Sequence, residues 1–274
     1  MPSLAWNLDE WGSSYEWADA GEEWSVPWGG SEAEWQSCIL PRVARFLPAD
    51  SILEIAPGFG RWTERLIPSC NTYLGVDLAE RCVTACAERF GNHEGVRFDV
   101  NDGRSLPMVP DGSTDLVFSF DSLVHVEDDI IGAYLKEFRR VLGKDGVAFI
   151  HHSNIGVYRA MNALRDGLAF IGNLWAPSKA VAGRVGLTPW DNQRGRSMTA
   201  ERFVELSRDA GVACIGQEII NWSNPLLIDC ISVVTQPGSK WERPNVRTTN
   251  RYFRTAARSS AAAARVFLSM KAKR

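Results

Sequence analysis

The chain of 274 residues can bury a large core, and its length favours one α/β domain with added segments over two large domains. Its hydrophobic share of 45%, charged share of 23% and formal net charge of −3 are typical of a soluble globular protein and give no overall reason to expect nucleic acid as a partner. Because the six cysteines form no C-x-x-C pair, no run of about 18 apolar residues occurs and the N-terminus lacks a signal-peptide pattern, we expect a cytoplasmic protein with no zinc site, no disulfide framework and no membrane span.

Residues 1–32 are rich in tryptophan and in acidic residues. They contain five of the eleven tryptophans, and residues 1–37 hold eight carboxylates without a single Lys or Arg. The aromatic positions follow no clear helical or strand period. We therefore interpret residues 1–32 as an arm or lid.

Residues 33–236 show the pattern of one α/β domain. An amphipathic helix is predicted over residues 31–47, with Pro41 as a kink, and short apolar runs then alternate with helical ones. Such alternation is typical of a parallel sheet with helices on its faces. The predicted strands lie at about 51–56, 72–77, 95–99, 115–120 and 146–151, and the predicted helices near 61–68, 79–90 and 127–142.

The second half of this domain contains an insertion and a closing pair of strands. Residues 155–196 interrupt the alternation with a mixed stretch that we interpret as a helical cap over the strand ends. Thr199 is predicted to be the N-cap of a helix that runs through Asp209. The apolar runs Val212–Ile220 and Asp229–Thr235 follow as two adjacent strands, predicted to be antiparallel.

Residues 237–274 form a basic tail with ten Lys or Arg and a single acid, Glu242. Its alanine-rich stretch at 256–264 is compatible with a surface helix or with a disordered end. The opposite charges of the arm and the tail lead to the hypothesis that they meet across a homodimer.

The loop after the first strand carries the strongest motif. Strand residues Ser51–Ala56 run into Pro57 and then into Gly58-Phe59-Gly60, and glycines at this turn let the backbone approach a ligand. A dinucleotide fingerprint would place its third glycine at Thr63, and the carboxylate of Glu54 is a poor neighbour for a pyrophosphate. The carboxylate suits the ammonium and sulfonium groups of S-adenosylmethionine instead.

Two further acids follow the next two strands. Asp77 ends the second strand, where its carboxylate can accept hydrogen bonds from both hydroxyls of a ribose. Asp102 and its neighbour Gly103 follow the third strand, where the adenine amino group can be recognised.

This arrangement resembles the class I S-adenosylmethionine-dependent methyltransferases over roughly residues 50–150 and the closing strands. The resemblance implies a doubly wound, seven-stranded α/β sheet in which the glycine loop and the strand-end acids bind the cofactor. The departures are Ala56 and Pro57, which concern the fine geometry of the loop. The residues implied to bind S-adenosylmethionine are Glu54, Gly58, Gly60, Asp77, Asp102 and Gly103.

The fourth and fifth strands end in groups able to move protons. Asp121 and His125 follow the fourth strand, and His151 and His152 end the fifth, on opposite faces because side chains alternate along a strand. Transfer of a methyl group to an alcohol needs a base, and we favour His152, with Asp121 orienting it or the substrate. His125 can instead pack over the cofactor. Asp121 with a neighbouring histidine can also hold a divalent metal such as Mg²⁺, and the sequence leaves base and metal open.

The tryptophan-rich arm and cap suggest the acceptor. Flat aromatic surfaces edged with carboxylates suit sugars, whose C–H faces stack on indole rings while their hydroxyls find acceptors. The segments Phe118–Glu127 and Ile150–Asn154 resemble a bacterial (actinobacterial) group of sugar O-methyltransferases that act on polysaccharides. We therefore predict an O-methyltransferase of a sugar or of an oligosaccharide or polysaccharide precursor.

Three alternatives remain. The cap can enclose an apolar pocket for a lipid or other natural product that is methylated on oxygen or nitrogen. The basic tail, with Tyr252 and Phe253, raises the alternative of a nucleic-acid methyltransferase, although no Asn-Pro-Pro-Tyr-like motif follows the fourth strand. A cofactor-binding module without activity is the last alternative, and the cluster of three histidines argues against it.

Overall fold

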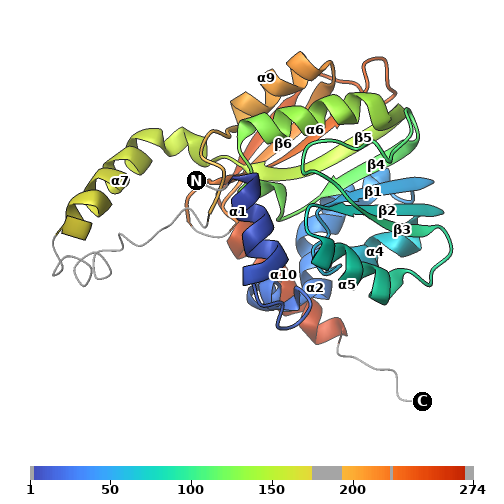
Figure 1. The fold of residues 1–274 in the computed structure, drawn as a ribbon, viewed down its shortest axis with the longest axis horizontal. Helices are drawn as coiled ribbons and strands as arrows, with labels where there is room; N and C mark the ends of the chain where they lie inside the picture. Colours follow the sequence, from blue (N-terminus) through green and yellow to red (C-terminus); the bar gives the residue numbers. More distant parts are fainter. Residues whose placement is uncertain (1–2, 175–192, 223–224, 269–274) are drawn as a thin grey trace.

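One mixed sheet organises the chain, as the ribbon of this computed structural model shows (Figure 1); the structure describes residues 3–174, 193–222 and 225–268. Within these residues the sheet has eight strands in the order β3-β2-β1-β4-β5-β7-β6-β8. The strands are β1 (Ser51–Ile55), β2 (Thr72–Asp77), β3 (Val96–Val100), β4 (Thr114–Ser119), β5 (Leu142–Ser153), β6 (Ala213–Ile220), β7 (Asp229–Thr235) and β8 (Val246–Asn250).

Strand direction brings most strand ends to one edge of the sheet. β1 to β5 pair in parallel, β7 is antiparallel to both β5 and β6, and β8 is parallel to β6. Every strand except β7 therefore ends at the same edge, where α/β proteins bind their ligands. The positions of the predicted strands and the antiparallel closing pair are confirmed.

The predicted count of seven strands is wrong by one. The additional strand, β8, comes from the basic tail and lies at the edge of the sheet beside β6. Its residues, Val246-Arg-Thr-Thr-Asn, are mostly polar and exposed. An edge strand with one free side carries little hydrophobic periodicity, so the pattern of the tail did not predict it.

Helices cover both faces of the sheet (Figure 1). On one face α6 and α9 pack on Leu53 and Val117 in a single core cluster, and on the other face residues of α3, α4 and α10 pack on Ile52 and Phe118. β1 therefore has apolar side chains buried on both faces, as expected for an inner parallel strand. The helices are α1 (Leu4–Asp9), α2 (Ser31–Glu34), α3 (Leu40–Val43), α4 (Thr63–Leu66), α5 (Glu80–Phe90), α6 (Asp128–Val141), α7 (Arg159–Leu174), α9 (Ala200–Ala210) and α10 (Phe253–Leu268).

Helix boundaries follow the local signals in the sequence. The helix predicted over 31–47 is interrupted: a π-helical turn, Trp35–Ile39, separates α2 from α3, and Pro41 lies in the first turn of α3, where its missing N–H costs nothing. The predicted continuous helix is thus divided, and the division lies just before Pro41. Thr199 caps α9 by accepting a hydrogen bond from the backbone N–H of Arg202, as predicted.

The arm and the tail meet within one chain. α10 packs against α2 and against the 3₁₀ turn Val26–Trp28 of the arm, and Figure 1 shows α1, α2 and α10 grouped beside the carboxyl edge of the sheet. Their opposite charges therefore need no second subunit to meet. The structure describes α7 from the predicted cap, while residues 175–192 of that prediction lie outside the described residues. No helix in the described ranges is long and apolar enough to cross a membrane.

Candidate functional site

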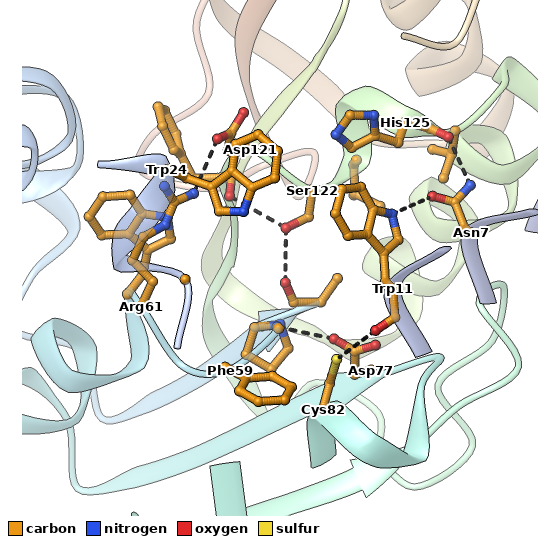
Figure 2. Close-up of a pocket in the computed structure, with 18 of the residues that line it drawn as sticks. Asn7, Trp11, Trp24, Phe59, Arg61, Asp77, Cys82, Asp121, Ser122 and His125 are labelled. Atoms are coloured by element: carbon orange, nitrogen blue, oxygen red, sulfur yellow. Dashed lines mark hydrogen bonds and ion pairs between the residues drawn. The ribbon is translucent and has the colours of Figure 1, made fainter. Parts of the chain in front are cut away.

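A cavity of about 620 Å³ lies at the carboxyl edge of the sheet. Its volume falls within the range of about 300–1,000 Å³ that is usual for small-molecule sites. Its walls are the loops after β1, β2, β3 and β4, the arm, and residues from the loop after β6 and from α10. Figure 2 shows Asp77 and Phe59 at one end and Asp121 at the other, with side walls formed by His125 and Trp11 and by Arg61 and Trp24.

The glycine loop packs closely against its surroundings. Gly58 and Gly60 have φ angles of +59° and +88°, in the left-handed region that favours glycine. A Cβ atom on Gly58 would lie 2.7 Å from the indole of Trp17, and one on Gly60 would lie 2.5 Å from the ring of Phe90. Gly58 lines the cavity, whereas Gly60 is not among its walls and allows α5 to pack against the loop. Both glycines are therefore required by the backbone, and only Gly58 faces the cavity.

Asp77 supports the loop and faces the cavity. Its Oδ2 accepts a hydrogen bond from Gly58 N at 3.1 Å, and its Oδ1 accepts one from Ala79 N at 2.9 Å. Burial raises the pKa of this carboxyl to about 6, so it is ionised at neutral pH. The position at the end of β2 is the one predicted for a ribose-binding acid.

The loop after β3 differs from the prediction. Asp102 is exposed and is not among the cavity walls; its Oδ1 accepts hydrogen bonds from the backbone N–H groups of Arg104 and Ser105 and so stabilises a turn. Asn101 and Gly103 line the cavity instead. Asn101 donates to the hydroxyl of Tyr134 at 2.9 Å and accepts from Gly103 N at 3.2 Å. The acid selected from the sequence is thus one residue away from the side chain that faces the ligand space.

Glu54 lies beneath the loop rather than in the cavity. Its side chain is fully buried and accepts hydrogen bonds from the hydroxyl groups of Thr63, at 2.8 Å, and of Tyr73. Burial raises its pKa to about 7. Glu54 is not among the residues that line the cavity, and its pairing with the cations of the cofactor stays a prediction. Its contacts connect β1, β2 and α4 below the loop.

Asp121 is held at the opposite end of the cavity by charged and aromatic groups. Its Oδ2 lies 3.1 Å from a guanidinium nitrogen of Arg61, and its Oδ1 accepts from the indole N–H of Trp222 at 3.2 Å. Arg194 approaches to 3.8 Å. Burial raises the pKa of Asp121, but the charges of Arg61 and Arg194 outweigh it and keep the pKa below its usual value. Asp121 is therefore an ionised anchor, with a strained φ of +63°.

His151 positions Asp121 from inside the core. Its Nδ1 accepts a hydrogen bond from the backbone N–H of Asp121 at 3.1 Å, so its proton resides on Nε2, which lies 4.0 Å from a carboxylate oxygen of Asp229. Burial lowers its pKa to about 3. The side chain is fully buried and does not line the cavity. His151 is neutral and acts as a positioning residue.

His152 lies on the other face of the sheet, as the predicted alternation requires. Its ring stacks on Phe203 of α9 at 4.3 Å between centroids. Its Nδ1 donates to the carbonyl of Ser153 and its Nε2 accepts from the hydroxyl of Ser232, both at 2.8 Å. Both ring nitrogens are satisfied and the side chain is completely buried, so His152 cannot reach a substrate in the cavity. The structure therefore does not support His152 as the base.

His125 is the predicted histidine that faces the cavity. Its Nδ1 lies 3.0 Å from the carbonyl oxygen of Gln193, and because a carbonyl can only accept, Nδ1 carries the proton and Nε2 keeps its lone pair. Its ring packs against Trp11 with centroids 5.3 Å apart. Burial lowers its pKa to about 4, so the ring is neutral at pH 7. His125 thus offers a proton acceptor to the cavity.

Several residues of the site were not predicted from the sequence. Arg61 directly follows Gly60, and its place after the glycine loop was an available signal. Arg194 forms a buried, two-point ion pair with Asp229 at 3.0 and 3.1 Å, although the two residues come from the predicted cap and from β7. Trp222 follows β6 and lines the same cavity end. No local pattern connects these positions, because only the fold brings them together.

No metal site accompanies Asp121 in the described part of the chain. Among these residues, no group of three or more His, Cys, Asp or Glu side chains is arranged to hold a metal ion. The charge of Asp121 is instead balanced by arginines, at 3.1 Å from Arg61 and 3.8 Å from Arg194.

The sequence was compared with protein-family models and with curated proteins. The family model described as a methyltransferase domain matches residues 52–146, which run from β1 into β5. No curated protein matches the chain by sequence.

Solved structures share the architecture at low sequence identity. An S-adenosylmethionine-dependent methyltransferase from Leishmania major has 12% identity and a TM-score of 0.54, with 85% of this chain and 82% of that chain covered. The N-methyltransferase NodS from Bradyrhizobium japonicum has 14% identity and a TM-score of 0.52, covering 76% and 97%. An S-adenosylmethionine-dependent methyltransferase from Clostridium acetobutylicum has 14% identity and a TM-score of 0.51, covering 77% and 91%. The chain therefore has the Rossmann-like fold of these proteins.

Proposed function

We propose that this S-adenosylmethionine-dependent methyltransferase transfers its methyl group to a hydroxyl of a sugar, either free or within an oligosaccharide or polysaccharide precursor. The methyltransferase domain and the fold identify the class of enzyme. The acceptor and the roles of individual residues are what we propose.

The aromatic wall of the cavity carries the proposal. Trp24, Trp28 and Trp222 line the end of the cavity away from Asp77, and Trp28 and Trp222 stack with centroids 4.1 Å apart. Indole rings beside a carboxylate, here Asp121, are suited to a sugar ring, because they contact its C–H face while the carboxylate accepts from its hydroxyls.

The cofactor is expected at the other end. Asp77 would accept hydrogen bonds from the ribose hydroxyls, the Gly58 loop would contact the methionine portion, and Asn101 and Gly103 would face the adenine. When bound, S-adenosylmethionine supplies an electrophilic methyl group on a sulfonium. The chain must then position a hydroxyl in line with this group and accept its proton.

His125 is the proposed proton acceptor. Its Nε2 bears the lone pair, and its ring is neutral at pH 7 because burial lowers the pKa to about 4. A weak base suffices when the hydroxyl becomes strongly acidic during bond formation. Asp121 is proposed to bind a second hydroxyl of the sugar, since its ion pair with Arg61 fixes it as a charged acceptor.

A second candidate acceptor is an apolar small molecule methylated on oxygen or nitrogen. The observation that favours it is the large share of aromatic and aliphatic side chains among the walls, including Leu4, Trp11, Phe120 and Leu123. Such an acceptor would leave Asp121 without a ligand hydrogen bond.

Methyl transfer to a panel of neutral and charged sugars, followed by mass spectrometry, tests the proposal. We expect Trp24→Ala to raise the KM for the sugar by about fivefold while the Kd for S-adenosylhomocysteine stays unchanged, because stacking on an aromatic face contributes on the order of 1 kcal/mol. Trp241→Ala is the matched control, since Trp241 packs on Phe46 and does not line the cavity. Transfer to apolar alcohols but to no sugar would overturn the proposal.

A further inference from the structure

α10 delivers two arginines to the acceptor end of the cavity. Because β8 runs parallel to β6, it ends at the same edge as β1 and β2, and α10 begins three residues later, at Phe253. Phe253 and Ala257 are buried in the core and fix the helix. Arg254 and Arg258, each one residue further along, lie on the adjacent face and line the cavity. The two arginines are four residues apart, so their side chains are neighbours on one helix face.

These two cations have no carboxylate partner among the residues that the structure describes. The backbone N–H of Arg254 donates a hydrogen bond to the side-chain oxygen of Asn221. The guanidinium of Arg258 lies 5.9 Å from the ring centre of Trp28. Burial, and secondly the charge of Arg258, lower the pKa of Arg254. Like charges four residues apart also destabilise a helix. An anion between them would remove both costs.

The other charges of the cavity are already engaged. Arg61 pairs with Asp121, Arg194 pairs with Asp229, and Asp77 accepts from the backbone of the glycine loop. Among the described residues that line this end of the cavity, Arg254 and Arg258 are therefore the cations that a ligand anion meets without a protein carboxylate beside them.

We propose that Arg254 and Arg258 form an anion subsite beside the Trp28–Trp222 stack, which binds a phosphate or carboxylate group carried by the acceptor. The inference deepens the proposed function and rests on it: the sugar lies on the tryptophans while its charged substituent contacts the two guanidinium groups. The acceptor class becomes that of phosphorylated or acidic sugars.

The carboxylate of the cofactor is the other anion that the arginines could bind. The cofactor end is built by the loops after β1, β2 and β3, whereas α10 follows β8, which is the last strand at the other end of the strand order. This separation favours the acceptor as the source, and the experiment distinguishes the two.

In the test, the protein is first saturated with S-adenosylhomocysteine. Inorganic phosphate and, in a separate experiment, acetate are then titrated into this complex at constant ionic strength. We expect saturable phosphate or acetate binding that Arg254→Gln and Arg258→Gln each weaken by about tenfold or more. Arg251→Gln is the control with the same loss of charge, because Arg251 is exposed and does not line the cavity. The anion that binds with the lower Kd indicates whether the charged group of the acceptor is a phosphate or a carboxylate.

Three results would overturn the inference. Neither anion binds saturably, or the Arg251 control loses as much affinity as the other two variants. The third result is that Arg254→Gln and Arg258→Gln weaken the binding of S-adenosylhomocysteine but not that of 5′-methylthioadenosine, which lacks the amino-acid portion. The arginines would then bind the cofactor instead of the acceptor. Failure of the wild-type protein to bind S-adenosylhomocysteine at all would instead contradict the proposed function.

Discussion

Replacement of Asp77 by alanine tests whether this strand-end acid binds the cofactor. The carboxylate faces the cavity and accepts from Gly58 N at 3.1 Å and from Ala79 N at 2.9 Å. A hydrogen bond to a charged group contributes about 1.5–3 kcal/mol, so the loss of two ribose contacts amounts to about 3 kcal/mol or more. We expect Asp77→Ala to raise the Kd for S-adenosylhomocysteine by roughly 100-fold or more.

Asp102→Ala is the matched control for this experiment. Both acids were assigned to the cofactor from the sequence, but Asp102 is exposed and holds a turn with Arg104 and Ser105 outside the cavity. We expect its Kd to stay within about threefold of the wild type, as for a surface change. Calorimetric titration measures both variants. Equal losses in the two, or a Kd for Asp77→Ala close to the wild-type value, would refute the assignment.

The pKa of Asp77 adds a pH dependence to the same measurement. Because burial raises its pKa to about 6, the carboxylate is protonated as the pH falls through 6 and then accepts hydrogen bonds less well. Affinity for S-adenosylhomocysteine should fall between pH 7 and pH 5. An Asp77→Asn variant, which has no proton to gain, should lack that part of the decrease.

Three further predictions concern the base and the buried charges. His125→Ala should lower kcat by about 100-fold or more at unchanged affinity for S-adenosylhomocysteine, since general bases contribute about 10²–10⁴-fold; an unchanged kcat would exclude His125. Arg194→Met leaves the fully buried Asp229 unpaired and should cost about 3–5 kcal/mol, a fall in Tm of roughly 6–15 °C that Asp229→Leu in the same chain partly restores; a shift under about 2 °C would contradict this. Burial raises the pKa of Glu34 to about 8, outweighing the charge of Arg61, so its contribution to stability is complete below its unfolded pKa of about 4.5 and is lost as pH rises through 8. The Tm of Glu34→Gln relative to the wild type should therefore increase from pH 5 to pH 9, and a pH-independent difference would count against the buried charge.

The periodic elements could be predicted because burial imposes their pattern. β2 and β7 have the predicted bounds, and α5 and α6 begin within one residue of the predicted positions. These segments bury apolar side chains at regular intervals, which is the signal that sequence periodicity detects. β8 buries little and was not predicted.

The site could be predicted only where one strand and its loop determine it. Gly58 and Asp77 follow from the strand-loop pattern, and both face the cavity. The choice between His125 and His152 depended on which face of β5 is covered by α9, which a local pattern does not contain. Arg254 reaches the cavity through an edge strand and a parallel register, so its role requires the complete sheet.

The stack of Trp28 on Trp222 is also an intrinsic spectroscopic probe of folding. The rings lie 4.1 Å apart with an angle of 15° between their planes, yet they are separated by 194 positions in the chain (222 minus 28). Closing a loop of this length costs more entropy than closing a short one, so the contact depends on the tertiary fold and not on local structure. The two indoles, coupled at this distance, should contribute a near-ultraviolet circular dichroism signal that accompanies the tertiary fold and not the helices alone.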